Sequence, residues 1–227
     1  EQATEDFLQR LLLRPEGELL RAALEKAARS IATPGALNGL AQTLLRMTVP
    51  GVPDLYQAND YWDFSLVDPD NRQPVDYARR QQTLQQVVDV PDLLMNWRDG
   101  RIKQALIART LGLRAEQATL FHRGTYQALE VLGSQAQRVL AFAREHEGKR
   151  AIVIVPIRCA QLLENSAEPQ IDAPLWGDTR VNLPFTEPEE NLKGLFSSVA
   201  VTKHRELMIS AALGDFPVNL IIQKTHT

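Results

Sequence analysis

The sequence predicts an α+β fold, with helices in the first half of the chain and an antiparallel β-sandwich in the second half. Apolar residues recur every three or four positions up to about residue 116, which is the period of an amphipathic helix. From residue 117 onward they form short runs bounded by Gly, Pro and Asn, which is typical of strands and sandwiches. We therefore expect two domains, residues 1–116 and residues 117–227.

Composition narrows the class of protein and its partners. The 227 residues are 44% hydrophobic and 23% charged, as in ordinary globular chains. A net charge of −3 weighs against nucleic acid as the main partner, because neutralising phosphates needs a basic surface. No apolar run approaches the roughly 20 residues that span a bilayer, so we expect no membrane partner and a cytoplasmic location.

The cysteine and histidine content bears on cofactors. Cys159 is the only cysteine, so no intrachain disulfide is possible, and its place after an apolar run predicts a buried, unreactive thiol. The four histidines are scattered without the spacing of metal ligands. We expect neither a metal nor a cofactor.

The helical half is predicted element by element. One helix carries Leu19 to Ile31, and Thr33-Pro34-Gly35 is expected to break it. A second helix carries Leu37 to Leu45 and ends before Pro50-Gly51. A short strand at Val52–Tyr56 and a long loop over residues 58–73 are expected to follow.

Two further helices complete the first half. Pro74 suits a first helical turn, with Asp76 near the positive end of the helix dipole. That helix is expected to carry residues 77–88 and to end at Pro91, and another helix is predicted over Ile102–Leu111. Trp97, between them, is interpreted as a buried residue of a helix junction.

The second half is predicted to contain strands, with a turn at Glu147-Gly148-Lys149 and a long surface loop over residues 161–178. The strands expected are residues 138–144, 151–157, 181–184, 206–212 and 218–223.

Functional chemistry is concentrated in one stretch, Val49 to Arg80, which combines carboxylates, amides, an arginine and large aromatic side chains. Carboxylates and amides hydrogen-bond hydroxyls, and flat rings cover the apolar faces of pyranoses, so this mixture suits the rim of a sugar site. A purely structural Asp-Pro-Asp-Asn turn, with Arg72 as its internal ion pair, is the alternative. The candidate substrate-binding residues are Asp54, Tyr56, Gln57, Asp60, Trp62, Asp68, Asp70, Asn71 and Arg72.

Two motifs in this stretch resemble known enzymes. Gly51-Val-Pro53-Asp-Leu-Tyr56 is similar to the run at the eighth barrel strand of the α-amylase clan, but Ala58 and Asp60 stand where that clan usually has Gly and Glu. The run from Tyr61 to Tyr77, YWDFSLVDPDNRQPVDY, resembles the signature of the maltooligosyl trehalose synthase family, with Gln73 in place of an arginine. Segments near Trp97, Phe121, Phe142 and Trp176 also resemble that family, in the same order.

The resemblance implies that this chain is the C-terminal part of such a synthase, with the last strand and helices of a (β/α)8 barrel followed by a β-sandwich. It implies an intramolecular transglucosylation that converts the reducing-end α-1,4 linkage of a maltooligosaccharide to α,α-1,1, as in trehalose biosynthesis. The partners implied are the maltooligosaccharide and the upstream barrel of the same protein. The catalytic carboxylates would lie upstream, so none is assigned here and the fragment alone is expected to be inactive.

Two other readings remain open. The chain could be a non-catalytic α-glucan-binding or scaffold module, or a part of another glycoside hydrolase of the α-amylase clan.

Overall fold

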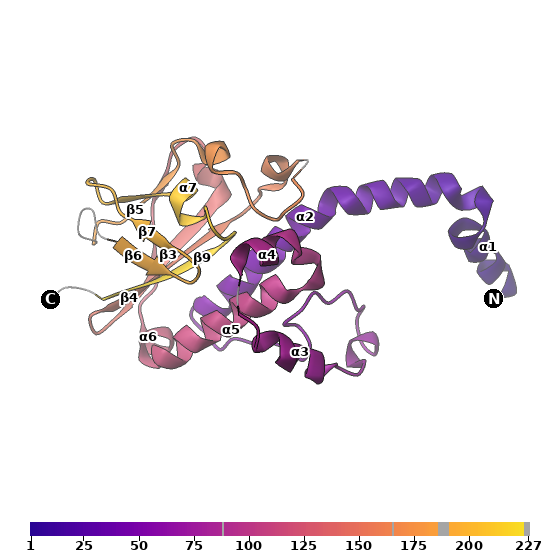
Figure 1. Ribbon diagram of the computed structural model, residues 1–227, viewed down its shortest axis with the longest axis horizontal. Helices are drawn as coiled ribbons and strands as arrows, with labels where there is room; N and C mark the ends of the chain where they lie inside the picture. Colours follow the sequence, from indigo (N-terminus) through magenta and orange to yellow (C-terminus); the bar gives the residue numbers. More distant parts are fainter. Residues whose placement is uncertain (88, 165, 186–190, 225–227) are drawn as a thin grey trace.

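Helices precede antiparallel sheets in the structure, so the mixed α+β class is confirmed (Figure 1). The computed structural model describes residues 1–87, 89–164, 166–185 and 191–224. The α-helices are α1 (Gln2–Leu13), α2 (Glu18–Thr48), α3 (Tyr77–Leu84), α4 (Val90–Met95), α5 (Arg101–Glu116), α6 (Ala118–Arg123) and α7 (Ile209–Ala212). Short 3-10 helices are η1 (Pro15–Gly17), η2 (Asp70–Arg72), η3 (Trp97–Asp99), η4 (Ala136–Arg138), η5 (Ala160–Leu163) and η6 (Ala173–Trp176).

Helix α2 runs without a break through Pro34, so the predicted break at Thr33-Pro34-Gly35 is wrong. An interior proline removes one backbone hydrogen bond and costs about 3 kcal/mol. Directly after it the helix buries an apolar face that includes Leu37, Leu40 and Leu44, each at most 2% exposed. Burying one such side chain stabilises by about 1.5–3 kcal/mol, so tertiary packing outweighs the proline.

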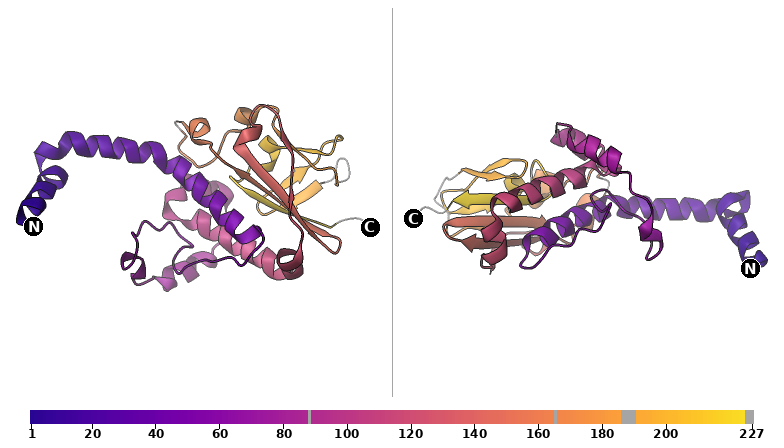
Figure 2. Two further views of the ribbon diagram at one scale, coloured as in Figure 1. Left: turned by 180° about the vertical axis from the view of Figure 1, so that it is seen from behind. Right: turned by 90° about the horizontal axis from the view of Figure 1, so that it is seen from below.

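The first part of α2 contrasts with its second part. Helix α1 and the outer part of α2 project away from the rest of the molecule (Figures 1 and 2). No residue of α1 is buried, and Leu13 and Leu19 are 78% and 87% exposed. The buried residues of α2 begin at Thr33. The C-terminal part of this helix therefore belongs to the core, whereas its N-terminal part projects from the rest of the chain.

The helix that follows the loop begins at Tyr77, so Pro74 lies before it and not in its first turn as predicted, and the helix also ends early. Asp76 is its N-cap, and its carboxylate accepts a hydrogen bond from the Arg79 backbone N–H at 2.9 Å. Helix α3 ends at Leu84 and not at Pro91, which instead lies in the first turn of α4, where a proline needs no N–H partner. Val88 lies outside the described residues. The predicted helix over 102–111 is the core of the longer α5.

The strands form two antiparallel sheets. They are β1 (Gln127–Ala128), β2 (Val131–Leu132), β3 (Val139–His146), β4 (Lys149–Pro156), β5 (Arg180–Asn182), β6 (Asn191–Gly194), β7 (Ser198–Ala200), β8 (Glu206–Met208) and β9 (Asn219–Lys224). One sheet has the order β1-β3-β4-β9-β6-β7 and the other has the order β2-β5-β8.

The predicted turn between β3 and β4 is confirmed, with Glu147 and Gly148 at positive φ and Val139 paired with Pro156 at the far end. The strand predicted over 206–212 is only half a strand. It ends at Met208, and residues 209–212 form α7, which packs on η6.

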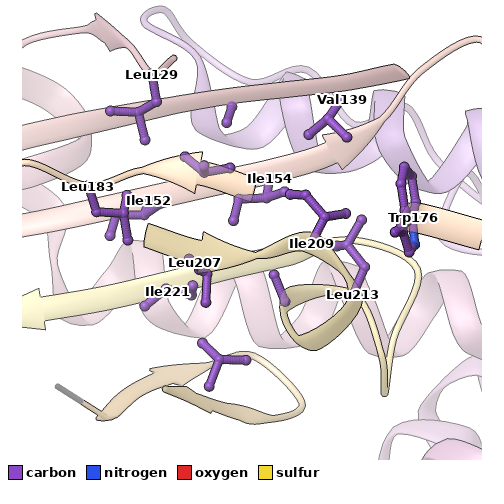
Figure 3. Packing of buried hydrophobic residues seen from close by; sticks show 14 of the residues in the cluster. Leu129, Val139, Ile152, Ile154, Trp176, Leu183, Leu207, Ile209, Leu213 and Ile221 are labelled. Carbon is purple, nitrogen blue, oxygen red and sulfur yellow. The ribbon is translucent and has the colours of Figure 1, made fainter. Parts of the chain in front are cut away.

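The six-stranded sheet is covered on both faces, which gives three layers. Side chains such as Ile152, Ile154 and Ile221 face the three-stranded sheet and meet Leu207 in one core (Figure 3). Phe142, Val153, Val155 and Leu220 belong to a second core, shared with α2, α5 and α6. Neighbouring residues of a strand belong to different cores because successive side chains point to opposite faces of the sheet. The helices before the expected boundary at residues 116 and 117 therefore share a core with the sheet that follows this boundary. The division into two domains stays a prediction.

The polar segment at 161–178 is not merely a surface loop. It contains η5 and η6, and it buries Leu163, Ile171 and Trp176, which are at most 4% exposed. Cys159, just before it, is buried as predicted, and burial raises the pKa of its thiol to about 11. Among the helices of the described residues, none combines the length and the hydropathy needed to cross a membrane.

Candidate functional site

The segment that the sequence singled out is a long loop between α2 and α3. The predicted strand at Val52–Tyr56 is wrong, because this stretch pairs with no other segment among the described residues. A strand needs a neighbour for its backbone groups, and here Val52 is 96% exposed. Ala58 takes a φ of +66°, a left-handed conformation that favours glycine, the residue that the related motif usually has at this position.

Asp60 anchors the loop to the helices. Its two carboxylate oxygens accept hydrogen bonds from Arg80 Nε and Gln104 Nε2, both at 2.9 Å. Arg80 also donates to the carbonyl of Ala58 at 3.3 Å, across the left-handed turn. The side chains of Arg80 and Asp60 are 17% and 26% exposed, so this ion pair is well shielded. Asp60 thus fixes the backbone of the loop with both oxygens.

Tyr61 is the most buried residue of the loop. It is 7% exposed, and its hydroxyl donates to Thr83 Oγ1 at 2.7 Å. The guanidinium of Arg80 lies over its ring at 4.9 Å from the centroid. Lys103 Nζ donates to its carbonyl at 3.1 Å. A side chain at Gly100 would come within 3.0 Å of Tyr61 Cβ, so the helix junction must be glycine for the loop to dock.

Trp62 and Phe64 differ in their burial. Trp62 is half-buried, and its Nε1 donates to the carbonyl of Trp97 at 2.6 Å. The two indoles meet edge to face, with centroids 6.2 Å apart. Trp97 is buried at a helix junction, as predicted, and donates to the carbonyl of Ala167. Phe64, in contrast, is 90% exposed.

The Asp-Pro-Asp-Asn run is a turn held by its own side chains. Arg72 Nε lies 2.5 Å from Asp68 Oδ1, which is the internal ion pair expected for the structural alternative. Asp70 accepts a hydrogen bond from the backbone N–H of Leu66 at 2.7 Å. Both members of the Arg72–Asp68 pair are mostly exposed, so the pair adds little stability. The turn fixes the position of Asn71.

A hollow of about 560 Å³ lies inside this loop, and we call it the rim cavity. Its volume is within the range of small-molecule sites. The amide oxygen of Asn71 is buried and has no hydrogen-bond partner among the described residues. An unpaired buried oxygen costs about 1–3 kcal/mol of stability. The lining residues are Tyr56, Asn59, Asp63, Ser65, Leu66, Val67 and Asn71.

Only part of the predicted site lines this cavity. Tyr56 and Asn71 come together there, 15 positions apart in the sequence. Trp62 lines a neighbouring hollow instead. The remaining predicted residues either hold the loop or lie on its outer surface: Asp54, Gln57, Asp60, Asp68, Asp70 and Arg72.

Three polar residues of the cavity were missed by the sequence analysis, namely Asn59, Asp63 and Ser65. The Asp63-x-Ser65 spacing was a usable signal, because Asp63 Oδ1 accepts the Ser65 N–H at 2.9 Å in an Asx turn. That backbone hydrogen bond is the main reason why the pKa of Asp63 is lowered. Asp63 therefore presents a carboxylate in its charged form at neutral pH.

Beside this carboxylate lies a shielded ammonium group. Burial lowers the pKa of Lys103, and the nearby Asp60 and Asp63 oppose that effect. Among the described residues, no group of three or more His, Cys, Asp or Glu side chains is arranged to hold a metal ion. The amides, carboxylates and hydroxyl of the site are groups that can form hydrogen bonds with hydroxyl groups.

Comparisons with known proteins connect this geometry to one enzyme. A Mycobacterium tuberculosis protein named as a maltooligosyl trehalose synthase is 33% identical over 186 residues, which are 82% of this chain and 20% of that protein. No family model matches the sequence.

Solved structures agree with the sequence relative. The maltooligosyltrehalose synthase of Arthrobacter ramosus is 28% identical, with a TM-score of 0.65 over 94% of this chain and 25% of that one. Another solved maltooligosyl trehalose synthase shares the fold, with a TM-score of 0.63, 21% identity, and coverage of 96% of this chain and 26% of that one. The chain spans about a fifth to a quarter of the length of these relatives. It is homologous to a part of maltooligosyl trehalose synthase.

Proposed function

We propose that this chain is the C-terminal part of a maltooligosyl trehalose synthase of the α-amylase clan, and that its rim cavity holds the glucose unit at the reducing end of the substrate. The observation that carries the proposal is the group of polar side chains, Asn59, Asp63, Ser65 and Asn71, around one hollow. Sugar hydroxyls can donate hydrogen bonds to such groups and accept hydrogen bonds from them.

The surrounding groups complete a site for a polyol. Asp63 and Ser65 offer acceptors, Asn59 offers both a donor and an acceptor, and Tyr56 offers a phenol ring that is 46% exposed. Leu66 and Val67 supply apolar surface on the same wall. A pyranose has hydroxyls on its edge and C–H groups on its faces, so it matches this distribution of polar and apolar groups.

The proposed reaction converts the α-1,4 linkage at the reducing end of a maltooligosaccharide to an α,α-1,1 linkage. The released glucose must stay in place and turn so that its anomeric hydroxyl attacks the glucosyl unit that it has just left. A cavity that holds this glucose by its other hydroxyls keeps the reaction intramolecular. It also keeps water from the reacting carbon, where hydrolysis would compete.

The remaining parts of the reaction belong to the upstream barrel, the proposed partner of this chain in one polypeptide. In this proposal, residues 51–56, which form no strand in this chain by itself, pair with that barrel and become its last strand. The catalytic carboxylates lie there as well, so the chain alone binds the substrate without turnover, in the cytoplasm where trehalose is made.

Calorimetric titration of the chain with maltopentaose tests the binding step. We expect heat of binding for maltopentaose and none for the β-linked cellopentaose. Asn71→Ala should weaken binding roughly tenfold, since it removes a hydrogen bond at a buried site. Asn38→Ala, at an exposed asparagine on α2, is the matched control and should change nothing. A chain that is folded by circular dichroism but gives no heat contradicts the proposal.

A chimaera tests the transfer step. The matching quarter of the Arthrobacter ramosus synthase is replaced by this chain, and loss of reducing ends from maltopentaose is measured beside release of free glucose. We expect loss of reducing ends with the unchanged chain, and a higher ratio of glucose release to transfer with Asn71→Ala. An unchanged ratio in a folded, active chimaera contradicts the glucose-holding role.

A scaffold or glucan-binding module is the second candidate function. The hydrogen bonds of Asp60 and Asp70 favour this second function, because these carboxylates accept hydrogen bonds that hold the loop in place rather than hydrogen bonds from a ligand. In that case Asn71→Ala leaves the chimaera unaffected.

A further inference from the structure

Lys103 of α5 lines a second hollow, which lies between the middle of α2 and residues 62–64 of the loop and which we call the lysine pocket. The pocket measures about 570 Å³. The residues of α2 that line it are Ala, Gly and Ile, and the opposite wall carries the rings of Trp62, Phe64 and Trp97. Asp63 is the other charged residue of the lining. One amine therefore borders a space whose walls are mainly apolar.

The ammonium group of Lys103 has few partners for a shielded charge. Its Nζ donates to the Tyr61 carbonyl at 3.1 Å and lies 5.7 Å from the centroid of the Trp62 ring. Within the part of the chain that the structure describes, Lys103 forms no ion pair with a carboxylate. An ammonium has three N–H groups, so one hydrogen bond and one ring contact compensate its burial only in part.

Two features of these surroundings favour the neutral amine. Burial makes the charged form costly, and the guanidinium of Arg46 on α2 repels it. Both effects lower the pKa of Lys103, while the loop carboxylates Asp60 and Asp63 oppose them. A lysine that is desolvated in an apolar pocket, or that lies near a second cation, becomes a better nucleophile because more of it carries a free electron pair. Lys103 meets both conditions.

We infer that Lys103 is a carbonyl-reactive lysine, which forms an imine with a small aldehyde whose apolar body fills the lysine pocket. The amine nitrogen attacks the carbonyl carbon, and a proton passes from nitrogen to the former carbonyl oxygen, which gives a carbinolamine. The second proton of the nitrogen then leaves with this hydroxyl as water, and a C=N bond forms. No oxidant, reductant or further reactant is needed. The reaction goes beyond the proposed function and does not depend on it.

The walls of the pocket select the kind of aldehyde. The Trp62 indole is held by its hydrogen bond to the Trp97 carbonyl at 2.6 Å and by the edge contact of the two rings. A flat aromatic aldehyde can pack against such a fixed ring, and Phe64 adds a second ring at the exposed side. A negatively charged aldehyde would lose its hydration among apolar walls and would be repelled by Asp63. The pocket therefore favours an aromatic, uncharged aldehyde.

Reductive labelling shows where the imine forms. The whole chain is treated at pH 7 with a limiting amount of benzaldehyde and with sodium cyanoborohydride, which reduces the imine to a stable amine, and modified peptides are quantified by mass spectrometry. We expect on the order of tenfold more adduct at Lys103 than at Lys26, an exposed lysine of α2. With glyoxylate, a charged aldehyde, this preference should disappear. In urea the two lysines should be labelled equally.

One exposed residue tests the role of the pocket. Phe64 is 90% exposed, so Phe64→Ala removes part of the wall without removing a core contact. We expect this change to lower benzaldehyde labelling of Lys103 about threefold, as for the loss of one aromatic contact, and to leave Lys26 unchanged. Phe7→Ala, at a phenylalanine of α1 that is 59% exposed, is the matched control and should change neither lysine.

Two results would overturn the inference. Labelling of Lys103 at or below the level of Lys26 in the folded chain would mean that the hydrogen bond to the Tyr61 carbonyl keeps the amine out of reach. An equal preference for Lys103 with benzaldehyde and glyoxylate, unaffected by Phe64→Ala, would mean that the pocket holds no aldehyde. Preference for Lys103 that requires the folded chain, the uncharged aldehyde and Phe64 supports the inference.

Discussion

The sheet core and the loop between α2 and α3 are built by different forces. The sheet buries long apolar strands on both faces, and Ile152, Val153 and Ile154 have no exposed surface. The loop buries one residue, Tyr61, below a tenth of its surface and is held mainly by polar side chains from its neighbours. Arg80 and Lys103 provide most of these contacts.

This difference explains where the sites are. Close-packed apolar layers leave no polar hollow, whereas a loop held at a few polar points can enclose one. It also implies that the loop opens more readily than the sheet.

The rate of thiol alkylation should differ most between the sheet core and the loop. Burial raises the pKa of Cys159 from its ordinary value of 9.0 to about 11, which alone lowers the thiolate fraction at pH 8 about 100-fold. We expect iodoacetamide at pH 8 to modify native Cys159 at least 100-fold more slowly than a loop cysteine made by Gln73→Cys in a Cys159→Ala chain. Equal rates would contradict the account of a closed sheet core.

The same thiol gives a pH dependence of stability. A folded pKa above the unfolded one means that the contribution of this thiol to stability is complete below the ordinary value of 9.0 and is lost as the pH rises toward 11. Urea unfolding at pH 8 and pH 10 should therefore show a smaller drop in stability for Cys159→Ala than for the unchanged chain.

Arg144 ties the helices to the sheet. It is 1% exposed and donates to the carbonyls of Thr48, Phe121, Gly124 and Thr125, at the ends of α2 and α6. Arg144→Met leaves these buried carbonyls unpaired, so we expect a loss of about 3–5 kcal/mol in urea unfolding.

Arg29→Met is the control for that change. Arg29 forms an ion pair with Glu25, but its side chain is 80% exposed. Its loss should leave the free energy of unfolding nearly unchanged. Equal effects at the two arginines would mean that the carbonyl cluster does not join the layers.

Arg80 should matter to the loop and not to the sheet. Arg80→Met removes the partner of Asp60 and the bond to the Ala58 carbonyl, so the loop should open more easily by about 1–3 kcal/mol. We expect faster proteolysis within residues 50–75 with little change in the melting temperature. Arg123→Met, at an exposed arginine of α6, is the control. Proteolysis that is unchanged by Arg80→Met would show that the loop is held by other contacts.

The cap of α3 should show the smallest effect. Asp76→Ala removes the side-chain bond to the Arg79 N–H, worth about 1 kcal/mol, so amide exchange in α3 should become roughly fivefold faster. Asp89, the N-cap of α4, makes no such side-chain bond, so Asp89→Ala should leave exchange in α4 unchanged. Equal acceleration in both helices would contradict the capping role of Asp76.

The difference between the sheet core and the loop also explains which features could be predicted from the sequence. The central strands β3, β4 and β9 were predictable because their apolar runs are long and their turns are marked by Gly and Asn. The continuity of α2 through Pro34 was not, because it depends on packing of distant residues against the helix. The helix α7 was not predicted for the same reason, because the apolar pattern of residues 209–212 is compatible with both a strand and a helix.

At the site, residue types were predictable but their roles were not. Tyr56 and Asn71 line the rim cavity as candidate binding residues. Asp60 carries a carboxylate that could also bind a hydroxyl, but it accepts hydrogen bonds from Arg80 and Gln104, which lie 20 and 44 positions away in the sequence. Sequence spacing carries no information about such distant partners.

The most direct test of the central claim is hydrogen exchange of the whole chain with and without saturating maltopentaose, read peptide by peptide. The account predicts slower exchange in peptides covering residues 54–72, with the strands β3, β4 and β9 unchanged. Slower exchange confined to the sheet, or no change anywhere in a folded chain, would contradict the claim that the loop between α2 and α3 is the sugar-binding surface.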